Sequence, residues 1–294
     1  MEQIIPYLFR LKNSLEFIIF QQLPAILWYN GCIKLHLGRI IEMYQLNNLF
    51  NNNNMKVIAN KGNFQVFEHE RDLSVSPADA VTAYFLSEMY VRKRQVLANL
   101  NGNSVTIQAG AMQWMLGNVQ ASSGVKGVGN FLGKMVSSAV TGESVAKPVY
   151  SGEGLLMLEP TYKHIILLDM DEWGGNVVLD DGLFLACDSS IEQKVVARSN
   201  VSSAVLGKEG LFNLSLRGSG TAVLESYVPQ QELIEFELKD DCIKIDGNMA
   251  IAWSGSLNFT VEKSTKSLLG SAVSGEGFVN VYRGTGKILM APTA

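Results

Sequence analysis

The sequence has few of the residues that build disulfide frameworks and zinc sites. Its three cysteines, Cys32, Cys187 and Cys242, are far apart, and none lies in a CxxC pair or at ligand spacing from a histidine. Neither a disulfide framework nor a structural zinc site is therefore indicated. A reducing cytoplasm fits this cysteine usage best.

Positive charge and long apolar runs are also scarce. The chain has 24 basic and 28 acidic residues, a net charge of −4, which lacks the basic surplus needed to bind a phosphate backbone. The one basic run, Arg92-Lys93-Arg94, is interpreted as a solvated strand end. No segment reaches the about 20 apolar residues that span a bilayer. We therefore expect no nucleic-acid partner and no membrane span.

What the sequence does have is a repeated pattern. A Ser-Ala-Val motif begins at Ser138, Ser203 and Ser271, and each copy is followed by a glutamate and then by a Gly-x-Gly sequence. The spacing from glutamate to first glycine is 9, 9 and 8 residues; the glutamates are Glu143, Glu209 and Glu276. This regularity predicts a threefold internal repeat. Units of roughly 60 residues would struggle to bury their sheets alone, so we expect one shared core.

Turn and strand signals predict the content of each unit. Asn101-Gly102, Asp181-Gly182 and Asp246-Gly247 are typical of tight hairpins between short strands. Each Gly-x-Gly sequence is expected to form a second hairpin between apolar strands. The predicted fold is all-β with a few short helices, arranged as three pseudo-symmetric repeats. The repeats span about 95–170, 171–240 and 241–294, in a single domain of residues 43–294.

Helices are expected at three places. Ser76, Pro77 and Asp79 have the order of a helix N-terminus, which predicts an amphipathic helix from Pro77 to about Met89, with Ala80, Val81, Tyr84 and Phe85 packed on the core. Two inserts, residues 130–140 and 264–273, also have helical spacing of apolar residues. Residues 1–42 lack a clean period, and we expect either an over-extended reading frame or a loose appendage outside the fold.

Four motifs point to a known family. They are Ala109-Gly110-Ala111-Met112, Gly117-Asn118-Val119, Thr141-Gly142-Glu143-Ser144 and the terminal Gly275-Glu276-Gly277 unit. Their order and spacing over about residues 95–292 resemble the family of altered inheritance of mitochondria protein 24, whose bacterial members form domain of unknown function 124. The resemblance implies a fold similar to the tryptophan RNA-binding attenuation protein, a short double-stranded β-helix with pseudo-threefold symmetry. It associates eukaryotic members with mitochondrial biogenesis and inner-membrane organisation, and it implies no catalytic residues.

The three motif glutamates are the sharpest candidate site. Under pseudo-threefold symmetry, Glu143, Glu209 and Glu276 would converge on an axis and hold a cation. In the simpler interpretation each glutamate accepts hydrogen bonds from local backbone amides. We prefer the second, because a hard cation usually takes six or more oxygens and no neighbouring polar positions recur with the glutamates.

Other motifs do not support chemistry. The glycine-rich stretch 124–135 fails as a phosphate loop, since Val128 and Met135 stand where a glycine and a serine or threonine are required. His36, His69 and His164 share no metal spacing. Trp114 and Trp253 fall in corresponding strands, where core packing is the usual role and pocket lining the alternative.

These observations favour a non-enzymatic scaffold or protein-interaction protein of the cytoplasm. Self-association is expected to use open sheet edges. The alternative is a small-ligand or metal-binding module that uses the pseudo-threefold axis or an inter-sheet cleft. No catalytic residue and no cofactor is predicted.

Overall fold

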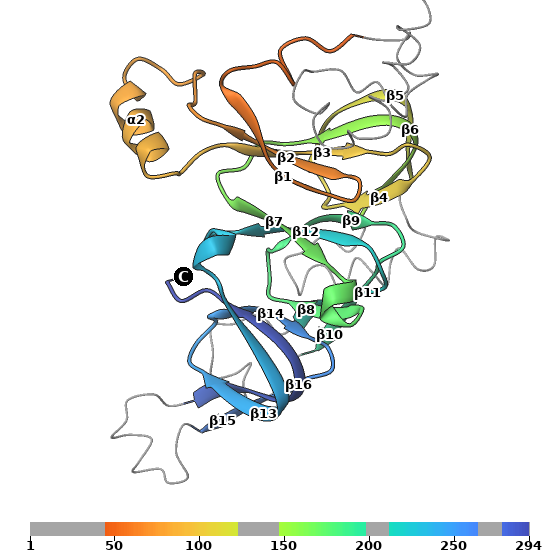
Figure 1. Cartoon of the computed structure of the whole chain (residues 1–294), viewed down its shortest axis with the longest axis vertical. Helices are drawn as coiled ribbons and strands as arrows, with labels where there is room; N and C mark the ends of the chain where they lie inside the picture. Colours follow the sequence, from red (N-terminus) through yellow and green to blue (C-terminus); the bar gives the residue numbers. More distant parts are fainter. Residues whose placement is uncertain (1–44, 123–146, 198–211, 264–277, 294) are drawn as a thin grey trace, which may run out of the picture. The chain divides into compact units, whose positions relative to one another are not determined.

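The computed structural model describes residues 45–122, 147–197, 212–263 and 278–293 (Figure 1). The chain divides at residue 55, and the described residues on either side are treated separately. Residues 45–54 form asparagine-rich turns, in which the Asn52 side chain accepts a hydrogen bond from the Asn54 amide at 2.8 Å. Everything below concerns the residues from 55 onward.

The first sheet contains nine strands. Their order is β1-β2-β3-β6-β4-β9-β12-β7, with β5 paired to β6 outside this path. The strands are β1 Met55–Lys61, β2 Phe64–His69, β3 Arg94–Asn99, β4 Ser104–Ile107, β5 Met112–Ser122, β6 Val149–Leu158, β7 His164–Asp169, β9 Phe184–Asp188 and β12 Thr221–Ser226.

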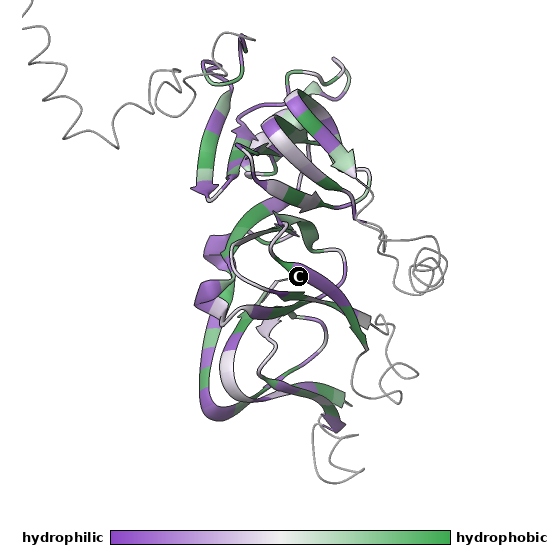
Figure 2. Cartoon of the chain, turned by 90° about the vertical axis from the view of Figure 1, so that its right-hand side faces the viewer, coloured by the Kyte–Doolittle hydropathy of each residue, from purple (hydrophilic) through white to green (hydrophobic). Residues whose placement is uncertain are grey.

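The second sheet contains seven strands. Their order is β10-β11-β8-β14-β16-β13, with β15 paired to β16. The strands are β8 Asn176–Leu179, β10 Glu192–Ala197, β11 Phe212–Arg217, β13 Ile234–Ile245, β14 Ala250–Ser254, β15 Asn258–Lys263 and β16 Phe278–Met290. Hydrophobic and hydrophilic residues alternate along several strands, as expected for strands with one buried face (Figure 2).

Helical structure is minor in the described residues. It comprises the α-helix α2, Ala80–Glu88, and two 3₁₀ turns, η2 at Asp171–Trp173 and η3 at Gln230–Glu232. Both sheets curl toward a closed shape. The expected all-β class with few helices is confirmed, while the three-repeat arrangement stays a prediction. The expected helices at 130–140 and 264–273 lie outside the described residues.

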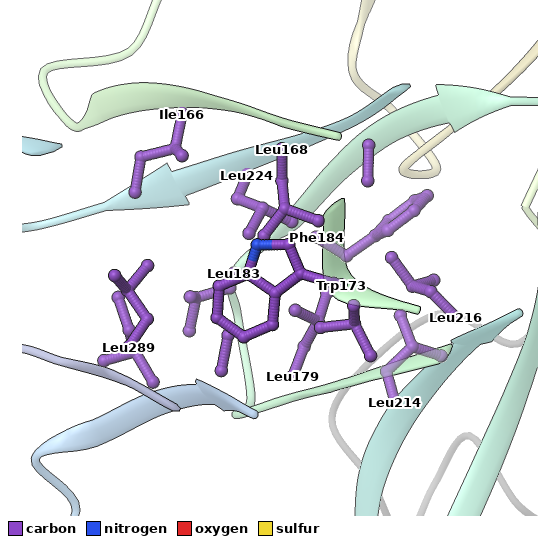
Figure 3. Close-up of a cluster of buried hydrophobic side chains, with 14 of the residues drawn as sticks. Ile166, Leu168, Trp173, Leu179, Leu183, Phe184, Leu214, Leu216, Leu224 and Leu289 are labelled. Atoms are coloured by element: carbon purple, nitrogen blue, oxygen red, sulfur yellow. The ribbon is translucent and has the colours of Figure 1, made fainter. Parts of the chain in front are cut away.

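Among the described residues, the core consists of three apolar clusters, each built from strands that lie far apart in the sequence. The first surrounds Phe64, Val96 and Leu156 within the first sheet. In the second, Trp173 of η2 lies among side chains of both sheets, so the two sheets pack face to face there (Figure 3). The third surrounds Trp253 and Tyr282 in the second sheet.

The Asn-Gly and Asp-Gly turns form as expected, but the predicted hairpins are wrong. Gly102, Gly182 and Gly247 have φ of 81°, 74° and 56°, the left-handed geometry that these turns need. The flanking strands are nevertheless not neighbours. Strand β6 lies between β3 and β4, β16 lies between β13 and β14, and β8 and β9 belong to different sheets. The turns at Gly102 and Gly247 therefore carry the chain past one strand, and the turn at Gly182 carries it from the second sheet to the first.

The Gly-x-Gly hairpins are also corrected. Gly152 and Gly154 lie inside the single strand β6, and Gly284 and Gly286 lie inside β16. Residues before the β6 glycines pair with β4 and those after them with β3. The chain at 218–220 instead leaves β11 in the second sheet and enters β12 in the first. The positive φ values bend the strand and change its partners without reversing it.

Candidate functional site

The three motif glutamates, Glu143, Glu209 and Glu276, lie outside the described residues, as do His36, Cys32 and the glycine-rich stretch 124–135. Within the described ranges, no group of three or more His, Cys, Asp or Glu side chains is placed to hold a metal ion. The axial cation site therefore stays a prediction. Two surface features elsewhere have the geometry of binding sites.

The first feature is the exposed face of α2, which we call the α2 face: Val81, Tyr84, Phe85 and Met89. These residues follow the i, i+3, i+4, i+8 spacing of one helix face. Ala80, Val81, Tyr84 and Phe85 were expected to pack on the core, and this is wrong: Ala80 is exposed, and Val81 is 68%, Tyr84 54% and Phe85 61% exposed. Met89, just after the helix, is 75% exposed. The buried residue of the helix is Ser87, on the opposite side. The sequence found the helix and its apolar stripe, but not the direction in which the stripe points.

The start of α2 also differs from the expectation. The helix begins at Ala80, three residues after Pro77, with Asp79 as N-cap and no side-chain capping bond. The Ser76 hydroxyl donates to the Asp79 carboxylate at 2.6 Å instead of accepting from a helix amide. The Ser-Pro signal thus forms a turn before the helix, in which the Asp79 amide donates to the Ser76 carbonyl at 3.0 Å.

Ion pairs fasten the base of the excursion that carries α2 between β2 and β3. Glu68 binds Arg94 at 2.7 Å and Arg92 at 3.0 Å, and Asp72 binds Lys93 at 2.7 Å. We call these five residues the ionic clasp. Arg94 is only 3% exposed and its guanidinium also donates to backbone carbonyls, so the interpretation of the basic run as a solvated strand end is wrong for Arg94.

The clasp leaves the α2 face in a locally neutral setting. The three basic side chains of the clasp share two carboxylates, and Lys56 pairs with Glu70. Residues 68–94 together with Lys56 carry five basic and five acidic side chains, so this region as a whole has no net charge. The charged hydrogen bond with Lys93, followed by hydrogen bonds from Ser74 and Tyr162, holds the pKa of Asp72 well below its usual range, so the carboxylate stays charged. Glu88 is the remaining charged side chain on the helix and lies near its C-terminal end.

The second feature is a cleft of about 250 Å³ on the second sheet. Leu214 and Leu216 of β11 face the Trp173 cluster, while the alternate residues Asn213, Ser215 and Arg217 line the cleft. Successive side chains of a strand point to opposite faces. The cleft therefore lies on the face of β11 that is turned away from that core.

Apolar side chains form one wall of the cleft. Trp253 of β14 and Phe259 of β15 contribute its aromatic part, together with Val178, Val196 and Leu257. The Trp253 ring packs against Phe259 and Tyr282, with ring centroids 5.6 Å and 5.4 Å apart. Trp253 is 4% exposed and packs in the core, as expected, while its ring borders the cleft. Its role in ligand binding stays a prediction. Trp114, in β5, does not line this cleft.

Polar side chains form the opposite wall. Arg217 of β11 lies directly across from Asn176 of β8 in the strand register, and Asn258 begins β15. The Ser215 hydroxyl donates to Asn176 Oδ1 at 3.3 Å, which leaves the Asn176 NH₂ group as a donor. Arg217 has no ion pair or hydrogen bond with any described side chain. Among the residues that the structure describes, the Arg217 guanidinium and the Asn176 NH₂ group therefore have no acceptor.

Gly255 provides the space that Asn176 occupies. A Cβ atom built on Gly255 would come within 2.3–2.5 Å of the Asn176 carboxamide, a distance that real Cβ atoms do not tolerate. The Gly255 amide also donates to the Asn176 carbonyl at 2.8 Å. Only glycine at position 255 leaves room for the Asn176 side chain in this position.

The candidate nucleophiles and bases are not poised for catalysis. Burial raises the pKa of the Cys187 thiol to about 12, although Gln193 donates to its sulfur at 3.0 Å. The thiol therefore stays protonated and inert at neutral pH. Burial and the nearby positive charge of Arg94 lower the pKa of His164, which keeps the ring neutral. Asp169 ends β7 and pairs with Lys61 at 3.0 Å, as a partly solvated strand end would.

Sequence reasoning missed the polar wall of the cleft. The signal was present in Asn213-Leu214-Ser215-Leu216-Arg217, where polar and apolar residues alternate in the interior of a strand. The alternation shows that one strand face is polar. It does not show that Asn176 and Asn258, from strands distant in sequence, border the same cleft.

Comparisons with known proteins identify the family. A family model described as mitochondrial biogenesis AIM24 matches residues 89–293. An uncharacterised protein of Streptococcus pyogenes serotype M6 is 33% identical over 196 residues, which cover 64% of this chain and 76% of that protein. A crystal structure of a Streptococcus pyogenes protein is also similar, with 30% sequence identity and a TM-score of 0.49. The match includes 68% of this chain and 87% of the chain in the crystal structure. Because the family model matches more than half of the sequence, the chain belongs to the AIM24 family.

Proposed function

We propose that this protein is a non-enzymatic interaction protein of the cytoplasm that associates with a second copy of itself through α2. The observation that carries the proposal is the α2 face, whose apolar side chains lie outside the core of their own chain. Large apolar side chains that gather on a surface mark interaction sites, whereas scattered ones need no explanation.

The extent of the surface supports a stable contact. The segment 73–91 exposes eight large apolar side chains, and Figure 1 shows α2 on the connection between β2 and β3. An interface of standard size takes about 800 Å² and about 20–30 residues from each partner, of which these eight side chains would supply the apolar centre. The ionic clasp holds the base of this segment, so the free energy lost in ordering it on association is reduced.

The charge around the α2 face favours a second copy over a charged partner. The clasp has three basic and two acidic side chains, but residues 68–94 together with Lys56 have five of each, so no net charge of one sign is left to attract an acidic protein or an anionic lipid surface. A neutral apolar stripe is complementary to itself about a twofold axis. Antiparallel packing places Glu88 of one copy beside the positive N-terminal end of the α2 helix of the other, where a carboxylate is favourable.

No membrane-spanning helix occurs in the part of the chain that the structure describes. The experiment below distinguishes a second copy of the chain from two other occupants of the α2 face, a lipid surface and a different protein. The family link to mitochondrial biogenesis is a description of the family and supplies no biochemical role for this chain.

Sedimentation velocity over a concentration series tests the proposal. The full chain should form a dimer at micromolar concentration, and Phe85→Lys should shift it to a monomer because it introduces a charge into the centre of the α2 face. Val57→Lys, a matched change at an exposed apolar residue of β1, should leave the dimer intact. A wild-type monomer, or a dimer that Val57→Lys also dissociates, would overturn the proposal. Binding of the monomer to anionic vesicles would identify a lipid surface as the occupant instead.

A further inference from the structure

We propose that the cleft on the second sheet binds a small organic carboxylate with a flat apolar body. In this assignment Arg217 and Asn176 hold the carboxylate, and Trp253 and Phe259 contact the body. The site is separate from α2, and the inference goes beyond the self-association proposed above.

The donors of the cleft determine the charge of the ligand. Arg217 and Asn176 face each other in the register of β11 and β8, and Asn258 adds a second carboxamide at the rim. None of these three side chains donates a hydrogen bond to another described residue. The planar guanidinium fork matches the two oxygens of a carboxylate. Among the described residues that line the cleft, none is acidic.

Neighbouring charges on β10 do not change the expectation that the ligand is an anion. Glu192 is the register partner of Arg217, and Lys194 is the register partner of Ser215, so both lie on the same sheet face as the cleft. Their opposite charges offset each other, and Glu192 forms no ion pair with Arg217. One uncompensated positive charge remains, which favours a monoanion over a phosphate dianion.

The size and the apolar wall determine the body of the ligand. A volume of about 250 Å³ is below the roughly 300–1,000 Å³ typical of sites for drug-sized molecules. Trp253 is held in place by Phe259 and Tyr282, so the wall is rigid before a ligand arrives. A flat apolar group packs on such a wall without displacing protein side chains. The cleft thus combines a fixed apolar wall with a polar wall of free donors.

Ligand-observed NMR by saturation transfer, with phenylacetate, benzoate and indole-3-acetate as probes and the full chain as receptor, tests this assignment. At least one acid should bind at millimolar concentration or tighter, and phenylacetamide, which lacks the charge, should bind about tenfold more weakly or not at all. Inorganic phosphate should not displace the bound acid at equal concentration. Failure of all three acids to bind, or equal binding of acid and amide, would overturn the proposal.

Variants locate the site and separate a lost ligand contact from a lost fold. Arg217→Ala should weaken binding by about 10- to 100-fold, and Arg217→Lys should recover only part of it because the fork is lost. Lys239→Ala removes the same charge from the same sheet outside the cleft and should have no effect. Gly255→Ala should also weaken binding, because its Cβ displaces the Asn176 side chain. Binding that survives both Arg217→Ala and Gly255→Ala would place the ligand elsewhere.

Discussion

Asp72 is the residue through which the ionic clasp responds to pH. Its carboxylate accepts hydrogen bonds from Ser74 at 2.6 Å and Tyr162 at 2.8 Å and pairs with Lys93 at 2.7 Å. The pKa of Asp72 is lower in the folded chain than in the unfolded one. Its contribution to stability is therefore fully present above about pH 4, the ordinary pKa of an aspartate, and is lost as the pH falls toward the folded pKa.

Asp72→Asn is accordingly expected to lower the free energy of unfolding by about 2 kcal/mol at pH 7, the range for hydrogen bonds to a charged group. The difference between variant and wild type should shrink below pH 4, since the carboxylate of the unfolded wild type is then protonated and folding must remove that proton. Urea denaturation at pH 7 and pH 3 measures both values. Glu232→Gln, at an exposed carboxylate of η3, is the control and should show no such loss. An Asp72→Asn difference that grows on acidification would contradict this account.

The ion pairs of the clasp could not be predicted from the local sequence. Arg92, Lys93 and Arg94 read as one solvated basic run, yet Arg94 is buried against Glu68. The pairing depends on the register of β2 and β3, which places Glu68 opposite Arg94. Local composition gives no register, so the charge run alone did not reveal the ion pairs.

At the scale of elements, the bend in β6 depends on close backbone approach. A Cβ atom on Gly152, at φ +119°, would come within 2.1 Å of the Asn118 carbonyl oxygen of β5. Gly102, at φ +81°, has no atom within 4 Å of the corresponding position. The positive φ disfavours any residue with a side chain at both positions. Only at position 152 would the added Cβ atom also clash with the backbone of a neighbouring strand.

Gly102→Ala is therefore expected to cost about 1–2 kcal/mol of unfolding free energy, the cost of a left-handed conformation in a residue with a Cβ. Gly152→Ala should cost about 3 kcal/mol or more, because the β5–β6 ladder must shift as well. Chemical denaturation of the two variants side by side measures the difference. Equal losses would show that the close approach is not required for the bend.

Element types were easier to predict than element pairing. Gly102, Gly182 and Gly247 indicated turns, and the turns are present, because positive φ is a local property. The strands joined by these turns pair with other strands, because pairing is decided by burial of whole faces. The Ser76-Pro77 signal likewise located α2, whereas an apolar stripe packs equally well on its own core or on another molecule.

At the scale of the molecule, the all-β class followed from turn spacing and strand composition, and the family followed from short motifs in a fixed order. The candidate sites did not follow in the same way. The motif glutamates lie outside the described residues, and the cleft is assembled from β8, β11, β14 and β15. Residues so far apart in sequence are brought together by strand pairing, because β11, β8 and β14 are neighbours in the second sheet and β15 pairs with β16.

The central claim is that the α2 face meets its counterpart in a second copy of the chain. Chemical cross-linking tests it most directly, with Val81→Cys in a Cys32→Ser/Cys242→Ser background and a short bismaleimide, since buried Cys187 stays unreactive. The account predicts a covalent dimer from Val81→Cys and none from Lys239→Cys, which is exposed on β13. Monomers from both variants, or equal cross-linking of both, would contradict it.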